Sequence, residues 1–404
     1  FFLATEYGIY TSLNAGKNWQ KLPGSPTISF KDIVIQEREN DLIGASFGRG
    51  FFVLDDFSAL REMSEDNLSK KGKLFEPRDA KLYKPRNSYG NTGAQFYVAK
   101  NPEYGAVFTY HLKDMPKTSK SKRIQSERKL NSDKKDVPFP GYDAISKEMN
   151  EKPASIILTI KDSEGNHIRN VKKNASNGSG RIAWNLRHKS YFPVRAGSSG
   201  PRWGYFNPSG PYVTPGEYHA EFYLENNGSV EKLDGPISFN VKPLRKGTLE
   251  GASYDDYNSF RIRVSNLYIE MSKYQDEFNM MKTKIELLDK ASLQLETFSP
   301  EIMKKISDFK TKYNAFDSET DGNPAKAEIG EWDKPSISMR TQIAMQGLST
   351  SYGPTDLNKS NLDIAEKLFD KLALDVKMFK SELESLENEV KELNPPHLSG
   401  SGIN

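Results

Sequence analysis

The chain has 404 residues, with 57 lysines and arginines, 54 acidic residues and no cysteine. This length accommodates two or three domains, each with its own hydrophobic core. The net charge of +3 gives no reason to expect a nucleic-acid partner, and the lack of cysteine excludes disulfides, thiolate nucleophiles and cysteine-ligated zinc.

The first motif covers residues 7–19 and predicts two short strands joined by a turn. Gly16 supplies the positive φ of a tight turn, Ser12 and Asn14 can bond turn amides, and Trp19 is expected to return into the core. The spacing Ser-x-Asn-x-Gly-x-x-Trp resembles the Asp box of sialidases and sortilin-type propellers, with Asn14 where that family usually has Asp. The resemblance implies that the box braces a propeller blade and is not catalytic.

Residues 1–62 are predicted to hold the final blades of a β-propeller. Their six expected strands are residues 1–5, 8–12, 19–22, 32–36, 42–46 and 50–55. A propeller closes a ring of about four to eight four-stranded blades, so six strands alone leave open sheet edges. The missing blades are therefore expected in sequence before Phe1 or in another chain, which makes this chain the carboxy-terminal part of a longer protein.

A second motif, residues 41–56, resembles the closing-blade motif of a Bacteroidota family of secreted propeller proteins, usually labelled BNR-repeat or sortilin-like glycosyl hydrolases. That motif commonly has His where this chain has Phe47, so any role of the His is absent here. Gly48 and Gly50 permit a tight turn. Arg49 between them either reaches the central channel of the propeller or bonds backbone carbonyls of the blade.

Residues 63–73 are polar and rich in lysine, which predicts a linker. Residues 74–245 then show short alternating strands separated by Asp, Gly and Asn turns, which is typical of an immunoglobulin-like or fibronectin-type β-sandwich. Trp184 is expected in the core between its sheets. The expected strands are residues 105–112, 154–161, 167–171, 180–186, 216–225 and 237–241.

Two insertions interrupt this domain. A charged insertion covers residues 113–152, and its part 117–135 has eight basic residues and two acidic ones. It either meets an acidic glycan or lipid headgroups or is a solvated helix or loop. A second segment, residues 191–212, mixes aromatic and basic residues and is either a binding loop or packs against the propeller. Its candidate contact residues are Arg195, Arg202, Trp203, Tyr205 and Phe206.

Residues 250–404 are predicted to form an antiparallel α-helical bundle or coiled-coil hairpin, because two long runs repeat apolar residues at alternating spacings of three and four. Ser253 and Ser299 are expected N-caps, and a shorter helix is expected over residues 336–349. The first run is Tyr257, Phe260, Val264, Leu267, Met271, Tyr274, Phe278, Met281, Ile285 and Leu288. The second is Leu368, Leu372, Val376, Phe379, Leu383, Leu386, Val390 and Leu393.

The sequence carries no recognisable catalytic constellation. Its five histidines lack metal-ligand spacing, and it has no phosphate-binding loop, dinucleotide fingerprint or nucleophile elbow. No catalytic residue, metal site or cofactor is therefore predicted. A sialidase-type site would need an arginine cluster, a tyrosine nucleophile and acids from several blades.

The patterns together favour the carboxy-terminal part of a secreted or cell-surface Asp-box propeller protein, which acts as a binding or scaffold component through protein or glycan contacts. The alternative is the non-catalytic end of a sialidase-like glycoside hydrolase whose active site lies in upstream blades. The resemblance implies a bacterial protein, secreted or on the outer cell surface. Expected partners are the missing blades and an outer-membrane protein, surface protein or glycan; no transmembrane segment is predicted.

Overall fold

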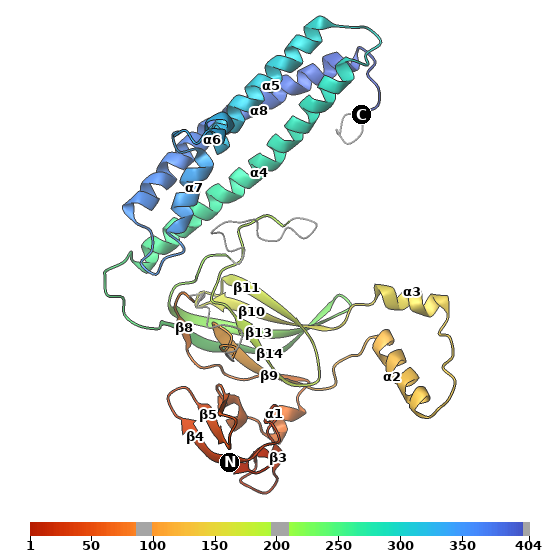
Figure 1. The fold of residues 1–404 in the computed structure, drawn as a ribbon, viewed down its shortest axis with the longest axis vertical. Coiled ribbons are helices and arrows are strands. Elements are labelled where there is room, and N and C mark those ends of the chain that lie inside the picture. Colours follow the sequence, from red (N-terminus) through yellow and green to blue (C-terminus); the bar gives the residue numbers. More distant parts are fainter. Residues whose placement is uncertain (86–98, 195–209, 399–404) are drawn as a thin grey trace. The chain divides into compact units, whose positions relative to one another are not determined.

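The computed structural model describes residues 1–85, 99–194 and 210–398 (Figure 1). The protein combines β-sheets with a helical carboxy-terminal region, as the sequence predicts in outline. The chain forms two compact units: the first contains Phe1–Lys189 and Val213–Lys246, and the second Ser190–Tyr212 and Gly247–Asn404. The described residues 190–194 and 210–212, placed by the sequence within the sandwich domain, thus group with the helices.

The first unit begins with two small antiparallel sheets, β1-β2-β3 and β4-β5-β6. All six predicted strands are present, with ends that shift by a few residues. Gly44 lies where the sheets meet, since a Cβ there would come within 2.8 Å of Ile9 and 2.9 Å of Phe30. The close approach therefore requires glycine. The strands are β1 (Phe2–Thr5), β2 (Gly8–Thr11), β3 (Gln20–Lys21), β4 (Phe30–Gln36), β5 (Asp41–Ser46) and β6 (Phe51–Leu54).

The linker predicted over residues 63–73 is instead structured. After the short 3-10 helix η1 (Ser58–Arg61), it contains helix α1 (Glu65–Ser69) and the start of strand β7 (Gly72–Leu74). The Ser64 side chain caps α1 by accepting from the amide of Asn67 at 3.2 Å. The linker was predicted from the lysine-rich composition alone. That prediction missed the N-cap and the acidic first turn that follows it, both of which favour the start of a helix.

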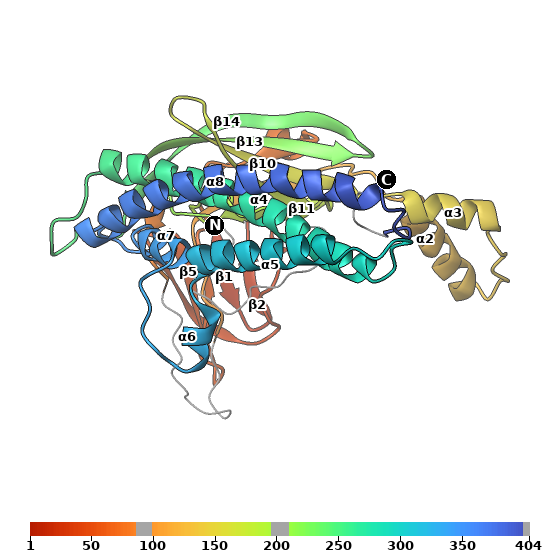
Figure 2. The same cartoon turned by 90° about the horizontal axis from the view of Figure 1, so that it is seen from above.

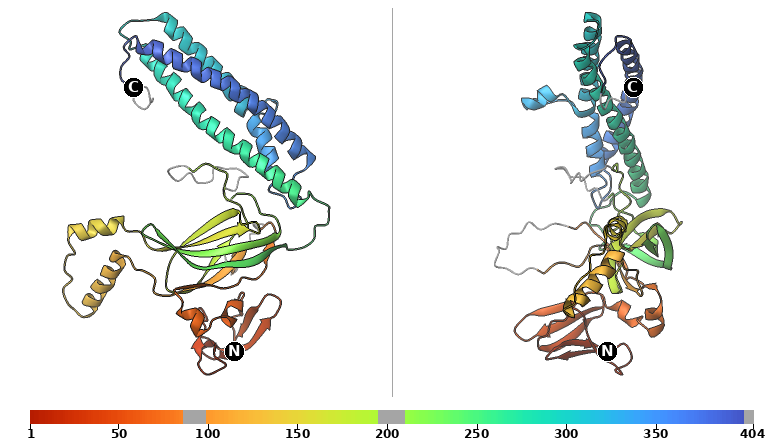
Figure 3. Two further views of the ribbon diagram at one scale, coloured as in Figure 1. Left: turned by 180° about the vertical axis from the view of Figure 1, so that it is seen from behind. Right: turned by 90° about the vertical axis from the view of Figure 1, so that its right-hand side faces the viewer.

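Two larger sheets follow in the first unit, and the five-stranded one is visibly curled (Figures 1 and 3). Its order is β11-β10-β13-β14-β8, and the facing sheet has the order β12-β9-β7. Only the pairing of β14 with β8 is parallel among the strands that the structure describes. The bounds are β8 (Ala80–Leu82), β9 (Ala106–Leu112), β10 (Ser155–Asp162), β11 (His167–Asn174), β12 (Gly178–Trp184), β13 (Gly216–Asn226) and β14 (Ser229–Pro243).

These sheets enclose one apolar core, and Trp184 lies fully buried within it as predicted. Its ring centroid is 5.3 Å from that of Tyr218 and 6.0 Å from that of Phe239. The indole N–H donates to the carbonyl of Arg187 at 2.9 Å, so the polar edge of the ring is satisfied. The charged insertion between β9 and β10 forms two helices, α2 (Ser119–Ser132) and α3 (Tyr142–Asn150).

The second unit is built around long helices whose predicted caps are present. Ser253 accepts from the amide of Asp256, and Ser299 from that of Ile302. The short helix expected over residues 336–349 is also found. The helices are α4 (Tyr254–Ser292), α5 (Pro300–Asp321), α6 (Pro324–Glu328), α7 (Ile337–Gln346) and α8 (Asp356–Lys391).

The prediction that the two long helices run antiparallel, as a hairpin, is wrong. Ion pairs join positions on α4 to positions on α8 that advance in the same direction, so these helices are parallel; the pairs are Arg263–Glu366, Glu277–Lys380 and Lys284–Glu387. Helix α5 runs the opposite way, with Lys305 beside Glu389 and Lys312 beside Glu382. Figure 2 shows α4, α5 and α8 side by side.

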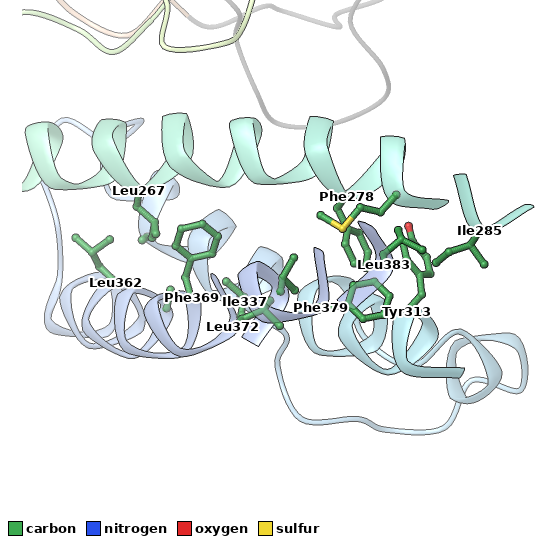
Figure 4. Close-up of a cluster of buried hydrophobic side chains, with 14 of the residues drawn as sticks. Leu267, Phe278, Ile285, Tyr313, Ile337, Leu362, Phe369, Leu372, Phe379 and Leu383 are labelled. Atoms are coloured by element: carbon green, nitrogen blue, oxygen red, sulfur yellow. The ribbon is translucent and has the colours of Figure 1, made fainter. Parts of the chain in front are cut away.

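Helices α4 and α8 are parallel because the segment between them is itself helical and apolar on one side. Helices α5 and α7 together return the chain to its starting end, and both contribute side chains to the core shared with α4 and α8 (Figure 4). Of the two predicted apolar runs, the first is confirmed. The second differs at its start, because Phe369 is buried where Leu368 was expected, and Leu362 and Ala365 continue the pattern toward the amino end of α8.

Candidate functional site

The turn between β2 and β3 has the hydrogen bonds that the first motif predicts. The Ser12 hydroxyl accepts from the amide of Gly16 at 2.8 Å, and Asn14 Oδ1 accepts from the amide of Asn18 at 2.9 Å. The same hydroxyl donates to Asn14 Oδ1 at 3.1 Å. Gly16 has a φ of +88°, which L side chains rarely adopt. These contacts make the turn self-bracing, and asparagine supplies the acceptor without a charge.

Trp19, expected in the core, is 43% exposed. Strand β3 has only two residues and follows Trp19 directly, so the indole remains on the turn instead of entering the space between the sheets. A methyl group at Gly16 would lie 3.9 Å from the indole and 3.7 Å from the ring of Phe1. The indole of Trp19 therefore lies against the outside of the turn that contains it.

The second motif forms the turn between β5 and β6. Gly48 and Gly50 both have a φ of +73°, as their expected role requires. The turn is closed by Ser46, whose amide and hydroxyl both donate to the carbonyl of Gly50, at 3.0 and 2.8 Å. Arg49 is exposed and makes no hydrogen bond or ion pair within the described chain. Neither of the two roles expected for Arg49 is visible in the described residues, and both stay predictions.

The outer face of the sheet β4-β5-β6 is apolar, and no described part of the chain buries it. Val34, Ile43 and Val53 lie opposite one another across the three strands, and Phe51 follows on the same face. Phe51 is 77% exposed and Val53 54%. The opposite face is packed on the core that Leu42 shares with the first sheet. Both faces of this sheet thus carry apolar side chains, although only one face is buried in the described chain.

A junction that the sequence did not indicate ties these small sheets to the rest of the first unit. Arg181 on β12 donates to the carbonyls of Asp55 and Asp56. Arg78 donates to the carbonyl of Glu39 at 3.2 Å and to its carboxylate at 3.1 Å. The residues around each arginine give no indication of these contacts, because each partner lies far away in the sequence.

Among the residues that the structure describes, no group of three or more histidine, aspartate and glutamate side chains is placed to hold a metal ion. Three of the histidines bond uncharged side chains: His111 contacts Ser179, His167 contacts Asn170 and His219 contacts Ser238. The candidate binding-loop residues Arg195, Arg202, Trp203, Tyr205 and Phe206 lie outside the described residues. No helix in the described ranges is both long and apolar enough to cross a membrane.

The carboxylate of Glu221 has a strongly lowered pKa, and its ion pairs within the sheet explain the shift. Glu221 on β13 is buried, and hydrogen bonds from Lys161 and Lys232, each 2.7 Å away, lower its pKa to about 2. Tyr223 donates to the same carboxylate at 3.1 Å. Lys161 and Lys232 come from the flanking strands β10 and β14, so the ion cluster fastens three adjacent strands.

Replacing Glu221 with glutamine is expected to lower the free energy of unfolding by about 1–3 kcal/mol at neutral pH. Because the folded-state pKa is depressed, this contribution is complete above the unfolded pKa of about 4.5 and is lost as the pH falls toward 2. The difference between wild type and Glu221→Gln, measured by denaturant unfolding, should therefore shrink over that range. Glu217→Gln, at an exposed position of the same strand, is the control; a constant difference down to pH 2 would contradict the assignment.

Comparisons with protein-family models, with curated proteins and with solved structures found no match. The candidate site is therefore defined by its geometry alone: two braced turns on a pair of small stacked sheets, one of which has an uncovered apolar outer face.

Proposed function

We propose that this chain is the carboxy-terminal part of a secreted or cell-surface Asp-box β-propeller protein, and that it acts as a binding or scaffold component through protein or glycan contacts. Under this proposal the two small sheets are the final blades of the ring. The remaining blades, in the same protein or in a partner chain, pack against the outer faces of these sheets.

The observation that carries the proposal is the apolar outer face formed by Val34, Ile43, Phe51 and Val53. Exposed large apolar side chains that are contiguous across a sheet indicate a face that packs against something. A propeller blade needs apolar residues on both faces, because a neighbouring blade covers each. The first sheet has a related feature, since Leu3 lies opposite Tyr10 on its outer face and is exposed.

The braced turn supports the same proposal. Ser12, Asn14 and Gly16 form hydrogen bonds within the turn itself, which fits a role in bracing a blade rather than in catalysis. We assign the immunoglobulin-like or fibronectin-type class to the larger pair of sheets as part of the proposal. In support, the Tyr218 hydroxyl donates to the carbonyl of Thr214 at 2.7 Å, four residues upstream, as in the tyrosine corner of such sandwiches.

A single engineered thiol tests the proposal, because the chain has no cysteine of its own. Val53→Cys should react with a maleimide rapidly in the 404-residue chain, where the position is exposed. The second sample is the protein purified from the cells that naturally produce it, with any further blades that it carries there. In that sample we expect the maleimide to label Val53→Cys more slowly by a factor of at least about ten, because an adjacent blade covers the face. Leu374→Cys, exposed on α8, should label at the same rate in both.

Equal labelling of Val53→Cys in the two forms would contradict the proposed ring. The same source-made protein should also fail to hydrolyse a panel of aryl glycosides that includes sialosides. Hydrolysis that disappears in a folded Arg49→Ala variant would instead support the glycoside hydrolase alternative, with Arg49 acting in the site.

A further inference from the structure

Helices α2 and α3 form a hairpin that buries no residue of either helix (Figure 3, orange and yellow). Arg123 on α2 joins them through two parallel bonds of 2.8 Å to the Glu148 carboxylate, and it also bonds Glu127 at 2.7 Å. The amide of Ser119 donates to Glu151 at 2.6 Å. A bidentate arginine pair holds two helices in a defined geometry. The hairpin is therefore an ordered feature of the surface with no core of its own.

The cationic character of α2 remains after these pairs are taken into account. Arg123 is balanced by Glu127 and Glu148, and its guanidinium holds the pKa of Glu148 below the usual value. None of the other four basic residues of α2 lies within ion-pair distance of a carboxylate in the described ranges; these are Lys120, Lys122, Arg128 and Lys129. Four cations without an ion-pair partner, on a helix without buried residues, are not explained by folding.

Two of these cations line a hollow. A cavity of about 640 Å³ is bordered by Thr118, Lys120, Ser121, Ile124, Gln125 and Arg128. It offers two positive charges and two hydroxyl groups around one apolar side chain. Cations and hydroxyls are the groups that bind phosphate and carboxylate oxygens.

Helix α3 adds an apolar stripe that no other part of the described chain buries. Tyr142, Ile145 and Met149 are spaced by three and four residues and so share one side of the helix. Tyr142 is 83% exposed and Met149 82%. Phe139, just before the helix, packs edge-on against Tyr142 with ring centroids 5.1 Å apart and is exposed as well. This stripe is a second feature that folding of the chain does not explain.

We infer that the α2–α3 hairpin binds an anionic lipid surface, with the lysines and arginines at the headgroups and the aromatic and methionine side chains in the interface. Amphipathic helices that bind membranes peripherally combine basic residues with exposed aromatic and apolar ones. Each lysine or arginine near an anionic surface contributes attraction, and aromatic rings favour the headgroup level. An acidic glycan would use the cations but would leave the stripe of Tyr142, Ile145 and Met149 without a partner.

The test uses the full 404-residue chain and sedimentation with vesicles of phosphatidylcholine alone or mixed with phosphatidylglycerol. The chain should bind the mixed vesicles at low salt and bind the neutral ones at least about tenfold more weakly. Two variants should each weaken binding to the mixed vesicles by about tenfold or more. The charge variant combines Lys120→Gln, Lys122→Gln, Arg128→Gln and Lys129→Gln; the apolar variant combines Tyr142→Ser and Met149→Ser.

Matched variants in the second unit control for net charge and surface hydrophobicity. They are Lys304→Gln, Lys310→Gln, Lys367→Gln and Lys371→Gln together, and Leu374→Ser with Met378→Ser; all change exposed positions. Both should bind like the wild type. Failure of the wild type to bind mixed vesicles, or an equal loss in the matched variants, would overturn the inference. Binding to heparin that the apolar variant keeps in full, without vesicle binding, would assign the hairpin to an acidic glycan instead.

Discussion

Replacing Trp184 with alanine is expected to destabilise the first unit by about 3–5 kcal/mol, the usual cost of removing a large aromatic side chain from a core. The side chain is fully buried between the two larger sheets and packs against Tyr218 and Phe239. Its removal also leaves the carbonyl of Arg187 without the indole donor. Since most domains have a total stability of only about 5–15 kcal/mol, the loss is a large fraction of it.

Hydrogen–deuterium exchange of the β9, β10 and β13 amides measures this change within the first unit. Trp332→Ala is the control, because Trp332 is exposed in the connection between α6 and α7, and its removal should cost less than about 0.5 kcal/mol. A cost below about 1 kcal/mol for Trp184→Ala would show that the indole does not fill the core.

An effect of similar size, about 3–5 kcal/mol, is expected in the second unit for Phe278→Ala. Phe278 on α4 is fully buried, and its ring stacks on that of Tyr313 with centroids 4.0 Å apart and an angle of 11° between the planes. A second stacked contact joins it to Tyr274 at 5.4 Å. The substitution removes both aromatic contacts and opens a cavity where α4 faces α5 (Figure 4).

Circular dichroism at the helical band, followed during denaturant unfolding, reports this change because the helices dominate the signal of the second unit. Met280→Ala is the matched control, since Met280 lies two residues further along α4 and is exposed. We expect that control to change the free energy of unfolding by less than about 0.5 kcal/mol. Equal effects at the two positions would mean that the buried face of α4 is wrongly assigned.

The parallel arrangement of α4 and α8 matters for how this unit is understood. A two-helix hairpin would place the residues after α4 and those before α8 at the same end. Here the return path through α5 and α7 separates them, and Tyr274, Phe278 and Tyr313 form one aromatic stack inside the resulting bundle.

Local patterns in the sequence were sufficient for several parts of this protein. The alternation of side chains located the six small strands, and Ser253 and Ser299 located two helix starts. The spacing of Ser12, Asn14 and Gly16 anticipated the hydrogen bonds of the first turn. All of these features depend on residues a few positions apart, where backbone geometry alone determines which groups can meet.

Features that depend on distant residues were decided by the tertiary structure. The spacing of apolar residues identified a buried face on α4 and on α8 but carried no information about direction, because a heptad pattern reads the same for parallel and antiparallel partners. Arg181 reaches the carbonyls of Asp55 and Asp56 only because folding brings β12 to the end of β6. The exposure of Trp19 likewise follows from the path of the chain around it.

Local sequence patterns were therefore enough for the type and approximate bounds of most elements, for the burial of Trp184, for most of the buried faces of α4 and α8, and for the two glycine turns. Three-dimensional contacts fixed which elements are neighbours, in which direction they run and which apolar faces stay exposed in the described chain. These faces include that of Val34, Ile43 and Val53 and the stripe on α3. The physical reason is that local conformation depends on neighbouring residues, whereas burial depends on the sum of contacts from the whole chain.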